Sequence, residues 1–241
     1  MDRFLVLFAR EPARQAREKG LRSSEAEELF RGFARGWAEA ARGAGARFVL
    51  ATPQEDRPAW ARALAGIEDP AWLAQRGPSL GARLEDAARR AAALGGRAVL
   101  VGGDVPPSAT ALLETFEGLE AGWDAALSPA PDGGISLLAI GSPDADLLRG
   151  FRPRRRTVFR DLLRALRLRG RRVRIVSPAP DVDGRASLRK LLRGNAIPPL
   201  LDSLARLALA RSPAFPENPS SLASPFLLHG PPVLRGPPSA I

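Results

Sequence analysis

Aspartates recur at the points where apolar runs of the chain end. Asp104 follows "RAVLVGG", Asp132 lies in "SPAPDGG", and Asp181 and Asp183 lie in "SPAPDVD". Carboxylate oxygens are the ligands that hard cations such as Mg²⁺ and Mn²⁺ prefer, and a carboxylate can also accept a proton from a hydroxyl. Glycine pairs beside Asp104 and Asp132 would let backbone approach a ligand closely. Aspartate and glycine are also common turn formers, so each segment by itself equally fits a structural role.

The rest of the composition narrows the chemistry that is available. Cysteine is absent and the single histidine, His229, lies in a proline-rich segment, so thiolate sites, disulfides and histidine acid–base chemistry have no residues to carry them. The net charge of +10 indicates an anionic partner, although a GC-rich genome also produces an alanine- and arginine-rich chain. A phosphorylated small molecule fits this charge. Nucleic acid is the second choice, because no nucleic-acid-binding module is visible.

The elements that would carry these residues alternate along the chain. Nearly continuous apolar runs predict buried β-strands, and apolar residues at helical spacing predict the helices between them, so the pattern indicates βαβ units. We therefore expect a three-layer α/β fold with a mostly parallel central sheet flanked by helices. The predicted strands are 3–8, 46–51, 97–102, 125–128, 135–140 and 172–177, and the predicted helices begin near Ser24 and Leu80 or span 110–119 and 158–168. Ser24 with Glu27 predicts a capping box.

Ligands of such sheets bind at the carboxyl ends of the strands, which is where the aspartates lie. Composition divides the chain into a domain over 1–195 and a segment over 196–241 with a short helix and a proline-rich tail. No apolar run approaches the roughly 18 residues of a membrane span, and the first ten residues lack a signal-peptide pattern, so we expect a cytoplasmic protein. The arginine-dense segment 149–174, with its Arg154–Arg156 cluster, fits either contact with an anionic surface or a solvated helix face.

Five segments, taken in order, resemble one known family. They are "LVLFAREP", "QRGPSLGARLEDAA", "VLVGGDVPPSATALLETFEGL", "ALSPAPDGGISLLAI" and "DVDGRASLRKLL", and together they extend over residues 2–193. They are similar to segments of the bacterial glycosyltransferase-like proteins that are often encoded beside radical-SAM and selenodomain proteins. That family is a branch of the nucleotide-diphospho-sugar transferase superfamily, which has the GT-A fold. The order of five weak motifs is far more specific than any one of them.

The resemblance implies a metal-dependent glycosyltransferase with a nucleotide-sugar donor and an unknown acceptor. It implies that Asp104 holds Mg²⁺ or Mn²⁺, that Asp181 or Asp183 completes the metal shell, and that Asp132 orients or deprotonates an acceptor hydroxyl. It also implies substrate-binding residues in the first loop, in the glutamine–glycine segment and at the glycine pairs: Arg10, Lys19, Gln75, Gly81, Arg83, Gly103, Gly133 and Gly134.

The first loop departs most from this family. The family's glycine is replaced by Gln15, its lysine–threonine–arginine by Glu18, Lys19 and Gly20, and the polar residue before the aspartate by Gly103. In the family, the glycine and the lysine–threonine–arginine of the first loop would bind nucleotide phosphates. The change therefore favours a second hypothesis, a catalytically inactive homologue that acts as a binding module. A nucleotidyltransferase of the same fold is a further alternative, as is a protein that uses the arginine-rich segment on nucleic acid or membranes.

Structural roles stay open for individual residues. Asp104 could cap the helix that follows it, and Asp132 in a Pro–Asp–Gly–Gly sequence is a strong turn signal. Either Asp181 or Asp183 could cap a helix near Ser187. Trp37 is interpreted as a packing residue.

Overall fold

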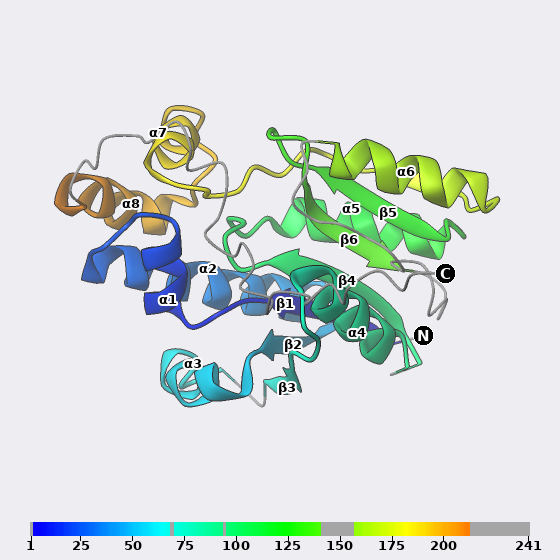
Figure 1. Ribbon diagram of the computed structural model, residues 1–241, viewed down its shortest axis with the longest axis horizontal. Coiled ribbons are helices and arrows are strands. Elements are labelled where there is room, and N and C mark those ends of the chain that lie inside the picture. Colours follow the sequence, from blue (N-terminus) through cyan, green and yellow to red (C-terminus); the bar gives the residue numbers. More distant parts are fainter. Residues whose placement is uncertain (1, 68–69, 94, 141–156, 213–241) are drawn as a thin grey trace, which may run out of the picture.

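A computed structural model of the chain describes residues 2–67, 70–93, 95–140 and 157–212. One seven-stranded sheet with the strand order β3-β2-β1-β4-β6-β5-β7 forms its centre (Figure 1). The strands are β1 (Arg3–Phe8), β2 (Ala46–Thr52), β3 (Ala71–Ala74), β4 (Arg97–Gly102), β5 (Ala125–Pro129), β6 (Ile135–Ile140) and β7 (Val173–Ile175). β6 pairs antiparallel with β4 and β5, and the other pairs are parallel. The predicted mostly parallel α/β sheet is confirmed.

Helices cover both faces of this sheet. Successive strand residues point to opposite faces, which is why the apolar run of β1 is continuous. Leu5 and Leu7 pack in one cluster with α2 (Ser24–Gly43) and α5 (Ala109–Glu120). Phe4 and Val6 pack in another with α4 (Leu80–Ala92) and α6 (Val158–Leu168). The fold therefore has the three layers that the sequence predicts.

A third apolar cluster lies beyond the carboxyl end of the sheet. It joins α1 (Pro12–Glu18) and the first half of α2 to α7 (Arg185–Arg193) and α8 (Pro199–Arg211), which gather at one side of Figure 1. Ala205 and Ala208 of α8 are fully buried in it. A short 3-10 turn (Gln54–Asp56) leads into α3 (Arg57–Ala63). This cluster fixes α1, which ends directly before Lys19, and the segment before α7, which carries Asp181 and Asp183.

Some details differ from the sequence-based expectations. The predicted capping box at Ser24 is wrong: Ser23 caps α2 by accepting a hydrogen bond from the Ala26 N–H, while the Ser24 hydroxyl donates to Glu25. β3, α1 and α3 were not predicted, because each is too short to show a periodic pattern. The Arg154–Arg156 cluster and the proline-rich tail lie outside the described residues. Within the described part of the chain, no helix is long and apolar enough to cross a membrane.

Candidate functional site

Asp104 lies in a tight turn directly after β4, and neighbouring elements hold this turn. The Val105 N–H donates to the Gly102 carbonyl at 3.2 Å, which closes the turn. The Val105 carbonyl accepts a 2.8 Å hydrogen bond from the indole Nε1–H of Trp37. Because Trp37 is fully buried in α2, this bond anchors the turn to the helical layer. Trp37 is therefore a packing residue, as predicted, and it also positions the turn that carries Asp104.

Gly103 leaves no room for a side chain. A Cβ at this position would lie 2.6 Å from the Ala9 Cβ and 2.9 Å from the Gln15 Oε1. The Gly103 N–H donates to the Phe8 carbonyl at 3.1 Å, so the turn lies against the end of β1. Gly103 thus brings the first loop into contact with the turn of Asp104.

Asp181 and Asp183 come from the extended segment that follows β7. Side chains alternate along an extended chain. Val182 is fully buried in the third apolar cluster, so the two aspartates project to the other side. The Val182 N–H donates to the Asp104 carbonyl at 2.9 Å, which joins this segment to the turn after β4. As a result, carboxylate oxygens of Asp104, Asp181 and Asp183 lie within 4.8 Å of one another. We call these three residues the aspartate triad.

Two serines that the sequence analysis did not single out hold this segment in place. The Ser128 hydroxyl donates to the Ser177 carbonyl at 2.7 Å, and the Ser136 hydroxyl donates to the Ala179 carbonyl. Both serines are buried in strands β5 and β6. The only sequence signal for them was a lone hydroxyl within each apolar strand.

The capping roles considered for these aspartates are wrong. Ser108 caps α5 by accepting from the Ala111 N–H, and Asp104 takes no part in that cap. At α7 the N-cap residue is Gly184, and the Ser187 hydroxyl accepts from the Asp183 backbone N–H at 2.8 Å. Since neither helix uses the triad carboxylates as caps, those carboxylates stay available to a cation.

Lys19 is a basic residue that contacts the aspartate triad. It lies at the C-terminal end of α1, and its Nζ is 2.6 Å from the Asp104 Oδ2 and 2.8 Å from the Asp183 Oδ1. Burial alone would lower the pKa of Lys19, but the two carboxylates outweigh it and raise the pKa above its ordinary value. Lys19 was predicted to bind substrate, and the structure places its ammonium between two predicted metal ligands.

Asp181 is the member of the triad whose ionisation is most perturbed. Burial and, after it, repulsion from Asp104 and Asp183 raise the pKa of its carboxyl from 3.8 to about 7. Asp132 contributes to the same repulsion, while Lys19 opposes it. The triad therefore carries more negative charge than Lys19 compensates.

Asp132 lies close enough to act electrostatically on Asp181, but it also forms the turn that its sequence predicts. Its Oδ1 accepts a 2.8 Å hydrogen bond from the Gly134 N–H, and Gly133 has a φ of 89°, which favours glycine. Asp132 is exposed, so its carboxylate faces solvent at the edge of the site.

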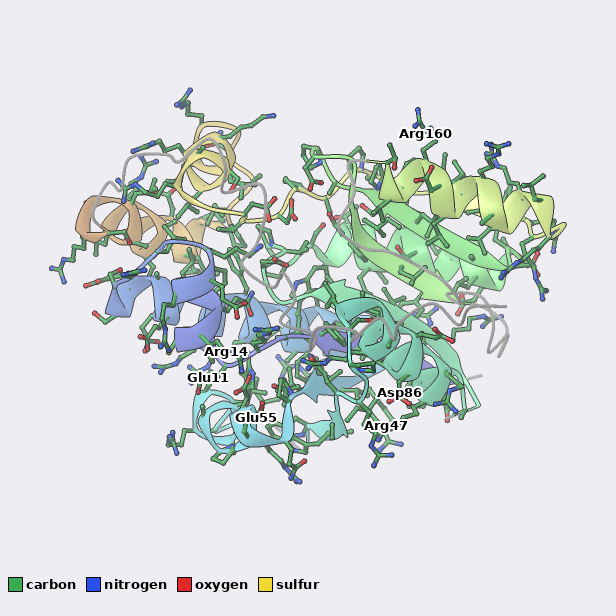
Figure 2. The ribbon with its side chains drawn as sticks, in the orientation of Figure 1. Glu11, Arg14, Arg47, Glu55, Asp86 and Arg160 are labelled. Carbon is green, nitrogen blue, oxygen red and sulfur yellow. The ribbon has the colours of Figure 1, made fainter. Side chains whose placement is uncertain are left out.

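The basic residues of the first loop are largely engaged with acidic neighbours. Arg10 forms an ion pair with Glu18, and the Arg14 Nε lies 3.4 Å from the same carboxylate. Arg14 also faces Glu55 and the buried Asp56, and Figure 2 shows Arg14 and Glu55 at the boundary between α1 and α3. The predicted substrate-binding role of Arg10 stays a prediction, with Glu18 as a competing partner.

The glutamine–glycine segment, which contains Gln75, Gly81 and Arg83, forms hydrogen bonds with the ends of β1 and β2. The Gln75 Nε2 donates to the Ala9 carbonyl at 3.2 Å and to the Ala51 carbonyl at 2.9 Å, so it joins the ends of β1 and β2. The Arg83 Nε donates to the Gly77 carbonyl at 3.0 Å. Gly81 is buried in the first turn of α4. The substrate-binding roles of Gln75, Gly81 and Arg83 stay predictions.

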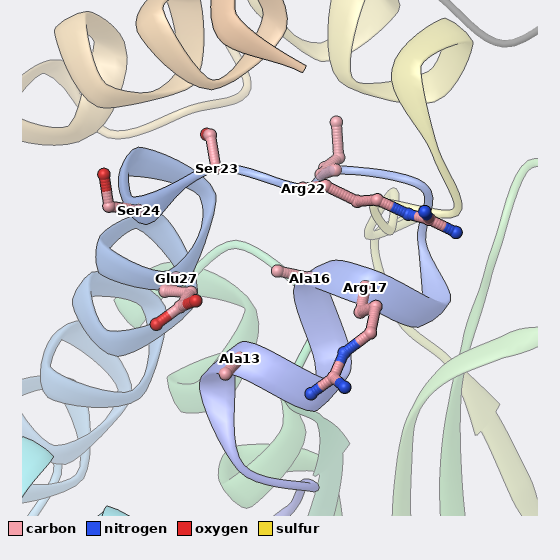
Figure 3. Close-up of a pocket in the computed structure, with 8 residues that line it drawn as sticks. Ala13, Ala16, Arg17, Arg22, Ser23, Ser24 and Glu27 are labelled. Carbon is pink, nitrogen blue, oxygen red and sulfur yellow. The ribbon is translucent and has the colours of Figure 1, made fainter. Parts of the chain in front are cut away.

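One surface hollow among the described residues lies apart from the triad. It lies between α1 and the start of α2, where Arg17, Ser23 and Glu27 line it (Figure 3), and it includes no predicted site residue. A second hollow lies near Arg3 and Arg47, at the amino end of the parallel strands. The triad lies apart from both hollows, at the carboxyl edge of the sheet, with Asp104 and Asp181 half-buried and Asp183 exposed.

The residues present fit a divalent cation. Three hard oxygen donors converge within 4.8 Å, and oxygen ligands of one such ion at about 2.1–2.6 Å lie up to roughly 4–5 Å apart. When Asp181 is ionised as well, three carboxylates and one ammonium sum to two negative charges, which a divalent cation would neutralise.

Solved structures with the same fold include proteins whose descriptions name transferases and synthetases of nucleotide-linked substrates. The chain is similar to a crystal structure from Desulfovibrio desulfuricans that is provisionally described as a nucleotide-diphospho-sugar transferase, with a TM-score of 0.74 and 24% identity over 87% of this chain and 96% of the other. It is similar to the inositol-1-phosphate CTP transferase of T. maritima, with a TM-score of 0.56 and 11% identity over 88% and 98%. It is also similar to a CMP:2-keto-3-deoxy-manno-octonic acid synthetase complexed with CTP. The TM-score is 0.52, and the two chains are 15% identical over 82% of this chain and 100% of the other.

Residues 37–153 match the profile of a bacterial family described as "Uncharacterized protein conserved in bacteria (DUF2064)". A search of curated proteins found no match. The fold that the resemblance implies is confirmed. The association with radical-SAM proteins stays a prediction.

Proposed function

We propose that the protein is a divalent-cation-dependent transferase that takes a nucleotide-sugar as its donor. The observation that carries this proposal is the convergence of Asp104, Asp181 and Asp183 at the carboxyl edge of a doubly wound sheet. Ligands of such sheets bind at this edge. The similarity to the Desulfovibrio structure supports the choice of a sugar nucleotide.

In this proposal the triad would hold Mg²⁺ or Mn²⁺, which when bound supplies positive charge to the donor diphosphate. The bond between the anomeric carbon and the β-phosphate oxygen breaks, and a bond from the acceptor hydroxyl oxygen to that carbon forms. Asp132 takes the proton of the acceptor hydroxyl, and the nucleoside diphosphate leaves. The exposed Asp132 carboxylate suits this role, because its turn hydrogen bond uses only Oδ1.

A nucleotidyltransferase is the second candidate, supported by the similarity to two solved structures whose descriptions name CTP. The two reactions differ in their products. A sugar transferase releases a nucleoside diphosphate from a nucleotide-sugar, whereas a nucleotidyltransferase releases pyrophosphate from a nucleoside triphosphate. Product analysis therefore separates them.

The test is a thermal-shift series with UDP-, GDP-, CDP- and ADP-sugars and with CTP and UTP, each with and without Mn²⁺. We expect one nucleotide-sugar class to stabilise the protein only with Mn²⁺, and we expect this effect to vanish in Asp104→Asn. Asp202→Asn, which removes an exposed carboxylate on α8, controls for the change in charge. Stabilisation by a triphosphate with pyrophosphate release would favour the second candidate. No stabilisation by any nucleotide would indicate a non-catalytic homologue.

A further inference from the structure

Lys19 occupies the position from which a cation would contact the triad. Its Nζ lies 2.6 Å from Asp104 and 2.8 Å from Asp183, so one nitrogen bridges two of the three carboxylates. In the described part of the chain, Lys19 is the only basic residue that contacts the triad carboxylates in an ion pair. A divalent cation bound by all three aspartates would compete with this ammonium for the same oxygens.

The residue type at this position is informative. Lys19 and Lys190 are the only lysines among 36 basic residues, and all the others are arginine. An ammonium is a compact point charge on a flexible stem, whereas a guanidinium is a planar fork. A single nitrogen within 2.8 Å of two converging carboxylates suits the compact group. Against its strong arginine bias, the chain therefore has at this point the side chain that most resembles a small cation.

The carboxylates and the ammonium are anchored very differently. Asp104 lies in a turn closed by backbone bonds and by Trp37, and the Val182 N–H bonds this turn to the segment of Asp181 and Asp183. Lys19 extends a four-carbon chain from the end of α1, and its side chain is 19% exposed. The ammonium can therefore leave while the three carboxylates stay in place.

We propose that Lys19 is a resident, displaceable cation of the triad. Its ammonium binds Asp104 and Asp183 while no divalent cation is present, and it leaves both carboxylates when a divalent cation binds. Lys19 thereby lowers the affinity of the triad for free metal ions and keeps the carboxylates together in their absence. This inference rests on the proposed role of the triad as a cation site.

The first test measures Mn²⁺ binding calorimetrically without nucleotide. We expect Lys19→Met to bind Mn²⁺ roughly tenfold more tightly than wild type, the change that corresponds to about 1.4 kcal/mol. Lys190→Met, which replaces the other lysine on α7, should bind like wild type. Equal or weaker binding by Lys19→Met overturns the inference.

A second measurement uses the unmodified protein. Isotope labelling of lysine gives NMR signals from only two ε-CH₂ groups, which Lys190→Met assigns. Titration with Mg²⁺ should shift the Lys19 signal and leave the Lys190 signal in place. An unmoved Lys19 signal at saturating Mg²⁺ overturns the inference even where Lys19→Met does not fold.

The two proposals fail in distinguishable ways. Tighter Mn²⁺ binding by Lys19→Met without any nucleotide binding would refute the proposed function and leave the inference standing. Absence of Mn²⁺ binding in both wild type and Lys19→Met would refute the cation site itself, and the inference with it. Metal-dependent nucleotide binding with an unmoved Lys19 signal would refute the inference alone.

Discussion

Replacing Asp181 by asparagine should stabilise the protein at alkaline pH. Burial and the neighbouring aspartates raise the pKa of this carboxyl from 3.8 to about 7. The folded protein therefore holds the Asp181 proton more tightly than the unfolded chain does. Asparagine keeps the size of the side chain and removes the charge, so the variant isolates the cost of ionising this group in the fold.

The sign and size of the effect follow from proton linkage. Between pH 3.8 and about 7 the folded state binds more protons than the unfolded state, so the Asp181 contribution to the free energy of unfolding falls as the pH rises. Each pKa unit corresponds to about 1.36 kcal/mol, which gives a cost of about 4 kcal/mol above pH 7. We expect Asp181→Asn to have little effect near pH 4 and to be more stable than wild type by up to this amount at pH 8.

Urea unfolding followed by circular dichroism at pH 4, 5.5, 7 and 8.5, without divalent cations, measures this difference. Asp202→Asn, the exposed control on α8, should differ from wild type by a small amount that is the same from pH 5.5 to 8.5. A difference between Asp181→Asn and wild type that does not grow with pH would refute the reasoning, as would a variant that is less stable than wild type at pH 8.5.

Three further variants test how the site is held. Trp37→Phe should lower the free energy of unfolding by about 1–3 kcal/mol, because the buried Val105 carbonyl loses its partner; an unchanged urea midpoint would contradict this. Gly103→Ala should lower the free energy of unfolding by about 1–3 kcal/mol, since its Cβ would lie 2.6 Å from the Ala9 Cβ. An unchanged free energy of unfolding would show that the first loop moves to make room for the methyl group. Ser136→Ala should cost about 1 kcal/mol and weaken Mn²⁺ binding measured by calorimetry; unchanged Mn²⁺ affinity would show that this serine does not position Asp181.

The fold could be predicted well because its strands are buried on both faces. A strand such as Arg97–Gly102 appears as an uninterrupted apolar run, and its neighbours repeat the pattern at regular intervals. The elements that were not predicted are short. β3, "AWLA", is only half-buried, and α1 has seven residues, so tertiary contacts rather than local pattern determine them.

The triad could be predicted in part. The position of each aspartate after a strand placed all three at the same edge of the sheet, and that much follows from topology. The sequence left open whether the carboxylates cap helices. The structure answers this through residues with weak sequence signals, such as Ser108 and Gly184, which take the two N-cap positions. Several neighbouring residues could each serve as the N-cap of a helix, and packing determines which of them does so.

Two positions that depart from the family pattern, Gln15 and Gly103, lie against each other in the structure. From the sequence, Gln15 in place of glycine and Gly103 in place of a polar residue looked like two independent losses. Gln15 is buried, and its amide lies where a side chain at position 103 would be. Gln15 therefore fills space that a side chain at position 103 would need, which a single sequence read position by position does not reveal.

The same argument from geometry changes the interpretation of the lysine in the first loop. Glu18 stands where the family has lysine, and it pairs with Arg10 and Arg14 on its own side of α1. Consecutive residues of a helix point about 100° apart, so Lys19, one position later, projects in a different direction and reaches Asp104 and Asp183. A basic residue therefore remains at the end of α1, but it contacts the triad. The first loop thus contacts the proposed cation site directly through Lys19, and we expect it to affect the affinity of that site for metal ions.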